Sequence, residues 1–198
     1  MDDYAAFRLE TDRLNALMQS TVSLSPAHRK FIAEIACLRL AILMENTIHL
    51  VCCKIVCGAP YLDGTAPAVL AVQRNIPKAV EAMQTFNRGG VFHKLKWNEG
   101  AGIRDNLAFL IDPADPIIGH LRNYGAFLTE VRYIRNHIAH RNDGTRKNFV
   151  KLIRRYYGAR VRGVTVGNLL VSPRVATPPL LMGHIARARV MMKDLARA

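Results

Sequence analysis

Apolar side chains recur every three to four positions through most of this chain, a rhythm typical of amphipathic α-helices. The clearest helix start in the first half is Ser25-Pro26, a capping serine followed by proline in the first turn. From there to Cys57 the chain is apolar around most of the helix circumference, which predicts a helix in the middle of a bundle. Three shorter segments also have helical spacing: Asp3 to about Gln19, Ile76 to about Arg88, and Gly102 to Ile111.

The second half of the chain contains the longest amphipathic stripe. Asp115-Pro116 is a helix start, and the run Asn142-Asp143-Gly144 is typical of a helix end. Between them, apolar residues recur at spacings of three and four from Ile117 to Ile138. We therefore predict one long helix, packed on a core, over this interval.

The remaining segments complete an all-α pattern. Thr145 to Tyr157 is a predicted helix with many Lys and Arg side chains, and a basic amphipathic helix follows Pro178-Pro179. Val164 to Val171 has some strand character but is too short to found a sheet. We predict an all-α, single-domain helical bundle over residues 1–198, with about six helices and short irregular or strand-like segments near 164–171.

The composition is that of a globular protein. Half of the residues are hydrophobic and 22% are charged, which excludes a disordered chain. The N-terminus opens on acidic residues, where a signal peptide would be basic. Charged residues also interrupt every apolar stretch before it reaches about eighteen positions. We therefore expect a cytoplasmic protein that does not associate with a membrane.

Four cysteines fall within one apolar helical segment, and two interpretations of them are possible. Cys53 and Cys57 share a helix face, so a metal site is conceivable. However, the segment lacks the paired knuckles and histidines of a zinc site, which favours buried free thiols in a reducing compartment. We predict that the protein holds no metal and no cofactor. The four residues are Cys37, Cys52, Cys53 and Cys57.

The positive charge is concentrated in the last third of the chain. Residues 1–130 carry equal numbers of acidic and basic side chains, whereas residues 131–198 carry 15 Lys and Arg against only Asp143 and Asp194. Such asymmetry indicates a polyanionic partner, with nucleic acid first and an anionic membrane second. The alternative is a solvated basic face without a partner.

Chemistry-bearing residues stand at the end of the long predicted helix, in the run Arg135-Asn136-His137-Ile138-Ala139-His140. With a turn of about 100° per residue, Asn136 and His140 point about 160° away from the apolar stripe, and Arg135 about 60°. His140 therefore faces solvent, a ligand or another subunit. Asn136 lies one turn from His140, where its amide can orient the imidazole.

This pair of residue types suits metal-free RNA cleavage. A histidine with a pKa of about 6.5 can take the proton of a ribose 2′-hydroxyl. A guanidinium can bind two oxygens of the phosphate as charge builds on them. Two other Arg-x4-His pairs occur, but the first, Arg88 to His93, contains two glycines, and the second, Arg132 to His137, lacks a polar residue after its arginine.

The motif Arg135-Asn136-x-x-x-His140 resembles the signature of the HEPN superfamily, and the wider chain is similar to its RiboL-PSP-HEPN branch. The resemblance implies a small helical bundle that acts as a metal-independent ribonuclease in toxin–antitoxin or phage-defence systems. Arg135 and His140 would be its catalytic pair, with Asn136 beside the arginine and Glu45 as a supporting acid. It further implies a homodimer with a composite active site, and an antitoxin or sensor protein as a possible partner.

Three functions compete for this sequence. The favoured one is an endoribonuclease whose RNA is held by the Lys and Arg side chains of the basic helices. The second is a non-catalytic HEPN-like module that binds RNA or a protein, and the third is a helical membrane-surface or scaffold protein. Against the third, the basic helices lack large aromatic anchors. The predicted RNA-binding residues are Arg141, Arg146, Lys147, Lys151, Arg154 and Arg155.

Overall fold

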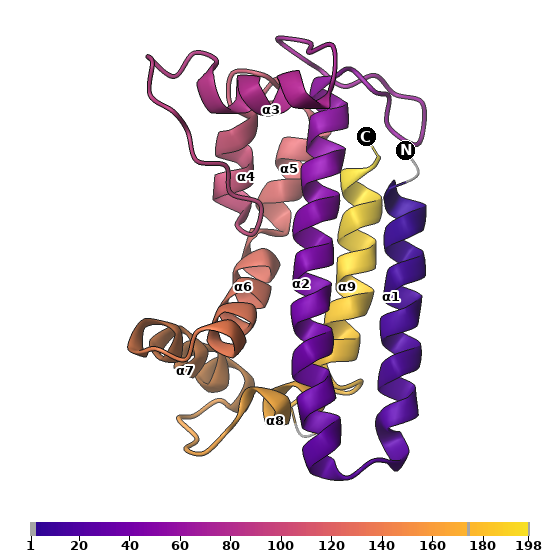
Figure 1. Ribbon diagram of the computed structural model, residues 1–198, viewed down its shortest axis with the longest axis vertical. Helices are drawn as coiled ribbons and strands as arrows, with labels where there is room; N and C mark the ends of the chain where they lie inside the picture. The colour runs from indigo at the N-terminus through magenta and orange to yellow at the C-terminus, as the bar shows by residue number, and fades with distance from the viewer. Residues whose placement is uncertain (1–2, 174, 198) are drawn as a thin grey trace. The chain divides into compact units, whose positions relative to one another are not determined.

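The computed structural model describes residues 3–173 and 175–197, and these form an all-α protein (Figure 1). Within this described part there are nine α-helices, a 3-10 turn and no strand, which confirms the predicted fold class but exceeds the predicted six helices. An isolated β-bridge joins Val69 and Ile111. The helices are α1 (Asp3–Ser20), α2 (Pro26–Val56), α3 (Ile76–Thr85), α4 (Gly100–Leu107), α5 (Pro116–Asn123), α6 (Gly125–Ala139), α7 (Asp143–Tyr157), α8 (Val166–Val171) and α9 (Leu180–Leu195).

The prediction of one continuous helix from Asp115 to about Asn142 is wrong, because α5 ends at Asn123 and α6 begins at Gly125. The residue between them, Tyr124, has φ −90° and ψ 2°, outside the α-helical range. A Cβ on Gly100 would lie 2.7 Å from the Leu121 carbonyl oxygen and 2.9 Å from the Gly125 Cα, so α4 packs against the break itself. The apolar spacing continues across this break, which is why the sequence pattern does not reveal it.

The strand-like interpretation of residues 164–171 is also wrong. Residues Val166–Val171 form α8, and the Thr165 side chain caps this helix by accepting a hydrogen bond from the Asn168 backbone at 3.2 Å. Val166, Leu169 and Leu170 are buried, at the spacing of one helix face. The β-branched residues favour a strand, but the cap and the burial of this face decide for a helix.

The chain divides into two compact units, each built from separate stretches of sequence. Unit 1 consists of Met1–Phe7, Met44–Thr129 and Val190–Ala198, and unit 2 of Arg8–Leu43 and Glu130–Arg189. Helices α1, α2, α6 and α9 contribute residues to both units. The whole motif and all the predicted RNA-binding residues belong to unit 2. The assignment of residues 1–198 to one HEPN-like domain stays a prediction.

In unit 1, a buried aspartate organises the loop that precedes α3. The Asp115 carboxylate accepts hydrogen bonds from the Tyr61 hydroxyl, from the Ala68 backbone at 2.8 Å and from the Ile117 backbone at 3.0 Å. The same side chain is the N-cap of α5. One residue therefore fixes both the start of α5 and the long loop before α3.

In unit 2, parts of α1, α2 and α9 lie side by side (Figure 1). Arg189 of α9 donates to the Thr11 hydroxyl at 2.8 Å and pairs with Asp12 at 2.5 Å. Arg39 of α2 lies 3.4 Å from Glu10 of α1. Between these polar contacts the helices bury apolar side chains, which supply most of the stabilisation. Those of unit 2 include Leu14, Ala33, Cys37, Leu40, Ile185 and Ala188.

Helix α2 is apolar enough and long enough to meet the length and composition criteria of a membrane span. Its most apolar 18-residue window has a mean hydropathy of 1.6, and half of that window is buried within the protein. The buried half is what a core helix requires, and core helices of globular proteins meet the same criteria.

Three of the four cysteines are buried, as predicted, and Cys57 is half-buried. Burial raises the pKa of the Cys37 thiol to about 12 and that of Cys53 to about 12, so both stay protonated at neutral pH. Among residues 3–173 and 175–197, no group of three or more His, Cys, Asp or Glu side chains is placed to hold a metal ion. The thiols of α2 are therefore packing residues of low reactivity.

Candidate functional site

The motif lies at the end of α6. Val131 and Ile134 are buried on the packed face of this helix, whereas Arg135 and Asn136 are half-buried. His140 follows the last helical residue and its side chain is exposed. The imidazole of His140 is therefore accessible to a ligand.

The amide of Asn136 is directed to the arginine and not to the histidine ring. Its Oδ1 accepts a hydrogen bond from Arg135 Nη1 at 3.0 Å. Its backbone carbonyl accepts from the His140 backbone N–H at 2.8 Å, which continues the helical hydrogen bonding to His140. We expected Asn136 to orient the imidazole, but in this structure it holds the guanidinium of Arg135.

The turn between α6 and α7 is fixed by a capping box. The Asn142 side chain accepts from the Thr145 backbone at 2.9 Å, and the Thr145 hydroxyl accepts from the Asn142 backbone at 3.3 Å. The Thr145 hydroxyl also donates to the His140 backbone carbonyl. These bonds satisfy the open N–H groups of α7 and fix the backbone of His140, although its side chain is free in solvent.

A second histidine of the motif, His137, is held in a very different environment. Its ring stacks on Phe149 at a centroid distance of 4.6 Å and an interplanar angle of 17°. Its Nδ1 lies 3.2 Å from the Thr145 hydroxyl, which donates its single proton to the backbone carbonyls of His140 and Asn142. Nδ1 of His137 is therefore the donor, and Nε2 of the neutral ring keeps its lone pair.

Burial lowers the pKa of His137, and the nearby charges of Arg141 and Arg146 lower it further, against an opposing effect of Glu34. The ring is therefore neutral at pH 7. In the sequence, the pair Arg132 and His137 fits the motif less well, because a tyrosine follows Arg132. In the structure the Arg132 guanidinium lies 5.4 Å from the centre of that Tyr133 ring.

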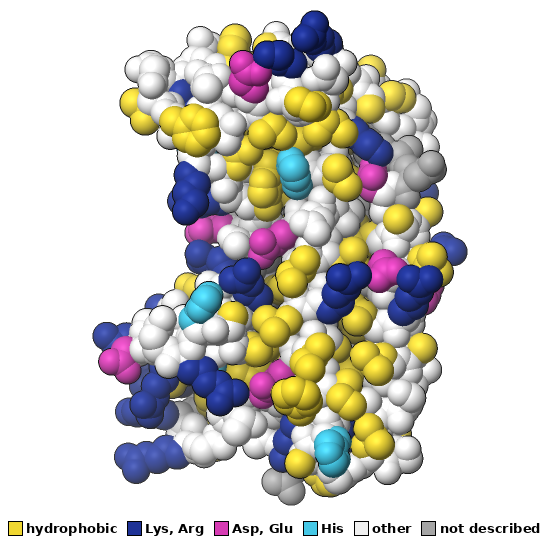
Figure 2. Space-filling model, in the orientation of Figure 1, with side chains coloured by type: hydrophobic (Ala, Val, Ile, Leu, Met, Phe, Trp, Pro, Cys, Tyr) yellow, Lys and Arg dark blue, Asp and Glu magenta, His cyan; other side chains and the backbone are white. Residues whose placement is uncertain are grey.

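The predicted RNA-binding residues separate into two groups. Arg141 lies 3.8 Å from Glu34 and Arg155 lies 3.2 Å from the buried Glu130, so each is close to a carboxylate. The other four have no ion pair within the described part of the chain and line one groove, which we call the α7 groove. Figure 2 shows Lys and Arg side chains gathered over α7. The α7 groove is lined by Asp143, Arg146, Lys147, Val150, Lys151, Arg154 and Arg160.

A buried polar cluster lies at the packed face of α7, and no sequence pattern predicts it. Glu130 of α6 accepts from the Tyr156 hydroxyl and lies 3.1 Å from His184 Nε2 of α9. Burial alone would raise the pKa of Glu130, but the hydrogen bonds from His184 and Tyr156, with the charges of His184 and Arg155, lower it overall. This cluster connects α6 to α7 and α9. No motif marks it, because its members are 26 and 54 residues apart.

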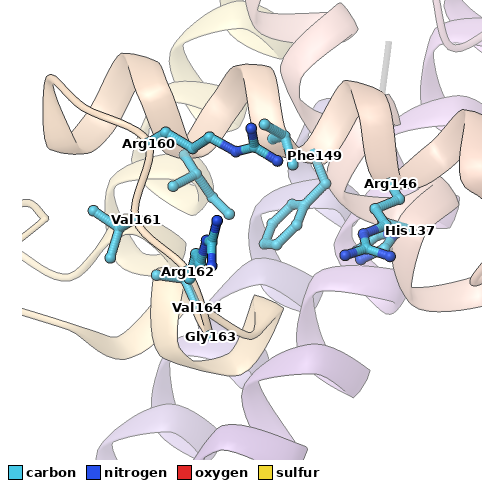
Figure 3. A pocket seen from close by; sticks show the side chains of 10 residues that line it. His137, Arg146, Phe149, Arg160, Val161, Arg162, Gly163 and Val164 are labelled. Atoms are coloured by element: carbon cyan, nitrogen blue, oxygen red, sulfur yellow. The ribbon is translucent and has the colours of Figure 1, made fainter.

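Two arginines in the loop after α7 lie outside the set of predicted RNA-binding residues, which ends before Tyr157. Arg160 and Arg162, together with His137 and Arg146, line a cavity of about 450 Å³ that we call the arginine pocket (Figure 3). The signal was present, since both arginines stand directly after the α7 segment in the basic third of the chain. The other lining residues are Phe149, Val150, Ile153, Val161, Gly163 and Val164.

Glu45, the supporting acid that the family resemblance implies, belongs to unit 1. Its carboxylate accepts a hydrogen bond of 3.4 Å from Asn98 Nδ2. The motif belongs to unit 2, so a role for Glu45 beside Arg135 and His140 stays a prediction.

Comparison with models of known protein families gives no match to this chain, and comparison with curated proteins and with solved structures gives none either.

Proposed function

We propose that this protein is a metal-independent endoribonuclease of the HEPN type, with Arg135 and His140 as its catalytic pair. The observation that carries the proposal is the placement of His140. Its side chain is exposed while its backbone is fixed by Asn136 and Thr145, and the next helix presents a groove of unpaired cations. A histidine held in this way beside a polyanion-binding surface suits general base catalysis on RNA.

In the proposed reaction, His140 takes the proton from a ribose 2′-hydroxyl. The 2′-oxygen then attacks the adjacent phosphorus and the bond from phosphorus to the 5′-oxygen breaks. The leaving 5′-oxygen takes a proton from water, and the protonated His140 releases its proton to the solvent. The products are a 2′,3′-cyclic phosphate and a free 5′-hydroxyl. Arg135, with its guanidinium oriented by Asn136, stabilises the charge that builds on the phosphate oxygens.

A homodimer is part of the proposal. Arg135 and His140 are five positions apart, so an ideal helix separates them by about 140° in direction and about 7.5 Å along its axis. Two motifs facing each other across a two-fold axis would bring both residue types to one phosphate. By the family resemblance, the protein would act in the cytoplasm as a toxin or phage-defence effector, with an antitoxin or sensor protein as a possible partner.

The first experiment is cleavage of total cellular RNA by the purified protein in EDTA. We expect the wild type to cut and to leave 2′,3′-cyclic phosphate ends. His140→Ala should cut at least about 100-fold more slowly while binding RNA equally well, because general base catalysis contributes a factor of that size. His28→Ala is the matched control, since His28 is also exposed and also belongs to unit 2.

Two outcomes would overturn the proposal. Equal cleavage by His140→Ala and the wild type would remove His140 from the reaction. Equal RNA binding by both proteins without any cleavage would favour the non-catalytic binding module, with Arg135 and His140 as a polar helix end.

A further inference from the structure

The arginine pocket is a cavity, whereas the His140 side chain is exposed on the surface. Residues on either side of the α6–α7 turn contribute to both. Figure 3 shows the Phe149 ring between the two loop arginines, Arg160 and Arg162, on one side and Arg146 with His137 on the other. All the lining residues belong to unit 2, and none of them is acidic. The pocket therefore has an apolar floor and a cationic rim.

The guanidinium groups of Arg146, Arg160 and Arg162 have no ion pair or hydrogen-bonding partner within residues 3–173 and 175–197. Elsewhere in unit 2, Arg141 and Arg155 are compensated by Glu34 and Glu130. Three uncompensated guanidinium groups around one cavity repel each other. A bound anion relieves that repulsion, and a guanidinium fits two oxygens of a phosphate at once.

The side chains that form the floor of the pocket are held in place by packing and hydrogen bonding. Phe149 and Ile153 are buried, and the ring of His137 is stacked on Phe149 and held through Nδ1 by Thr145. A neutral His137 leaves Nε2 as a hydrogen-bond acceptor for a hydroxyl or amino group. The cavity of about 450 Å³ is larger than a single anion needs and lies in the range of pockets for small organic ligands.

We propose that the arginine pocket binds one phosphorylated nucleotide unit, with Arg146, Arg160 and Arg162 on its phosphate and the apolar floor under its sugar or base. The nucleotide is either free or part of an RNA strand, and the phosphate chemistry is the same for both. This inference goes beyond the proposed nuclease and does not depend on cleavage.

The test is calorimetric titration of the full chain with 5′-AMP. A second ligand is a 5′-phosphorylated tetranucleotide with 2′-O-methyl groups, which cannot be cut by 2′-hydroxyl attack. The pocket variant is Arg160→Gln/Arg162→Gln. Both side chains are exposed and unpaired in the described chain, so the fold should be retained, which thermal unfolding checks.

The matched control is Arg8→Gln/Arg13→Gln. It removes the same charge from two exposed arginines of the same unit that line neither the arginine pocket nor the α7 groove. We expect the pocket variant to lose at least about tenfold in affinity, which is about 1.4 kcal/mol. The control should lose less than about twofold for the small ligand.

The two ligand arms separate the sources of the nucleotide. Loss of 5′-AMP binding in the pocket variant alone identifies a pocket for free nucleotides. Binding of the tetranucleotide without binding of 5′-AMP, again lost in the pocket variant alone, assigns the pocket to a unit of the strand. Equal losses in the pocket variant and the control, no loss in either, or no binding of either ligand by the wild type overturn the proposal. Ligand binding by a protein that does not cleave RNA would support the pocket and contradict the proposed nuclease. RNA cleavage by a protein whose pocket binds no ligand would do the opposite.

Discussion

Two histidines of one motif have opposite surroundings. His140 is exposed and only its backbone is held, whereas His137 is stacked on Phe149, bound to Thr145 and kept neutral by burial and neighbouring arginines. The first is suited to reach a substrate and the second to shape a pocket. Thr145 connects them, because its hydroxyl contacts both residues.

Replacement of Arg135 by lysine tests the role of its guanidinium. Lysine keeps the positive charge but loses the paired donors and the fixed hydrogen bond to Asn136. We expect Arg135→Lys to cut RNA at least about tenfold more slowly and to bind it with unchanged affinity, since transition-state contacts are the ones removed. Cleavage rates and fluorescence anisotropy measure the two effects. Unchanged cleavage would exclude a role for the paired donors.

At the element scale, α8 reaches α2 through a glycine. A Cβ on Gly167 would lie 2.6 Å from the Lys30 Cβ and 3.0 Å from the Lys30 carbonyl oxygen. The Gly167 backbone N–H also donates to Glu34 at 2.9 Å, and the other oxygen of that carboxylate lies 3.8 Å from Arg141. Glu34 therefore ties α8 and the α6–α7 turn to α2.

Two glycine-to-alanine substitutions test this close approach. Gly167→Ala should destabilise the protein by about 1–3 kcal/mol, because backbone atoms of α2 must move. Gly183→Ala in α9 is the control: its Cβ would meet nothing within 4 Å, and alanine favours a helix by up to about 1 kcal/mol. Urea unfolding of both variants measures the difference. A harmless Gly167→Ala would show that α8 is not packed closely on α2.

Across the whole molecule, we expect the free energy of unfolding to depend on the Glu130 cluster and the proposed RNA binding to depend on the surplus of positive charge. Glu130 is 3% exposed and joins α6 to α7 and α9 through Tyr156 and His184. The basic third of the chain is compensated only in part, with Glu34 beside Arg141, Glu130 beside Arg155 and Asp12 beside Arg189. The Glu130 cluster predicts that stability depends on pH, and the surplus of positive charge predicts that RNA affinity depends on salt concentration.

Loss of the Glu130 charge should weaken the fold and change its response to acid. The pKa of Glu130 is lowered from its ordinary value of 4.5. Its stabilisation is therefore complete above pH 4.5 and is lost as the pH falls through the lower folded-state pKa. We expect Glu130→Gln to cost about 3 kcal/mol at pH 7 and to flatten the loss of stability with acid, as measured by urea unfolding between pH 3 and 7.

The control for this prediction is Glu81→Gln, which removes an exposed partner of Lys78. Surface pairs of this kind contribute less than about 1 kcal/mol, so its unfolding should resemble that of the wild type at every pH. Equal stabilities of the Glu130 and Glu81 variants would show that the buried cluster does not hold the helices together.

Affinity for RNA should fall steeply with salt if the α7 groove is the binding surface. About four phosphate contacts to a single strand predict a slope near −3 for the logarithm of affinity against the logarithm of salt concentration. Lys147→Gln/Lys151→Gln should reduce that slope by about 1.4, in anisotropy titrations between 50 and 300 mM salt. An unchanged slope in this variant would place the RNA elsewhere.

Much of the fold follows from local pattern. The Ser25-Pro26 start, the apolar α2 and the basic α7 are visible in the sequence, because capping and helical periodicity act over a few residues. Asn142, interpreted from the sequence as part of a helix end, is instead the N-cap of α7. The break at Tyr124 and the helical state of α8 are not visible in the sequence, since the spacing of apolar residues continues through the first and β-branched residues mask the second.

By itself, the sequence determined the all-α class, the concentration of positive charge after residue 130 and the motif at the end of α6, since each is a property of neighbouring positions. Only the tertiary structure decided which charges are compensated and which are left over. Glu34 and Glu130 approach Arg141 and Arg155 from distant parts of the chain, and Arg160 and Arg162 join His137 around one cavity. Burial and pairing depend on contacts between distant segments, which no local pattern records.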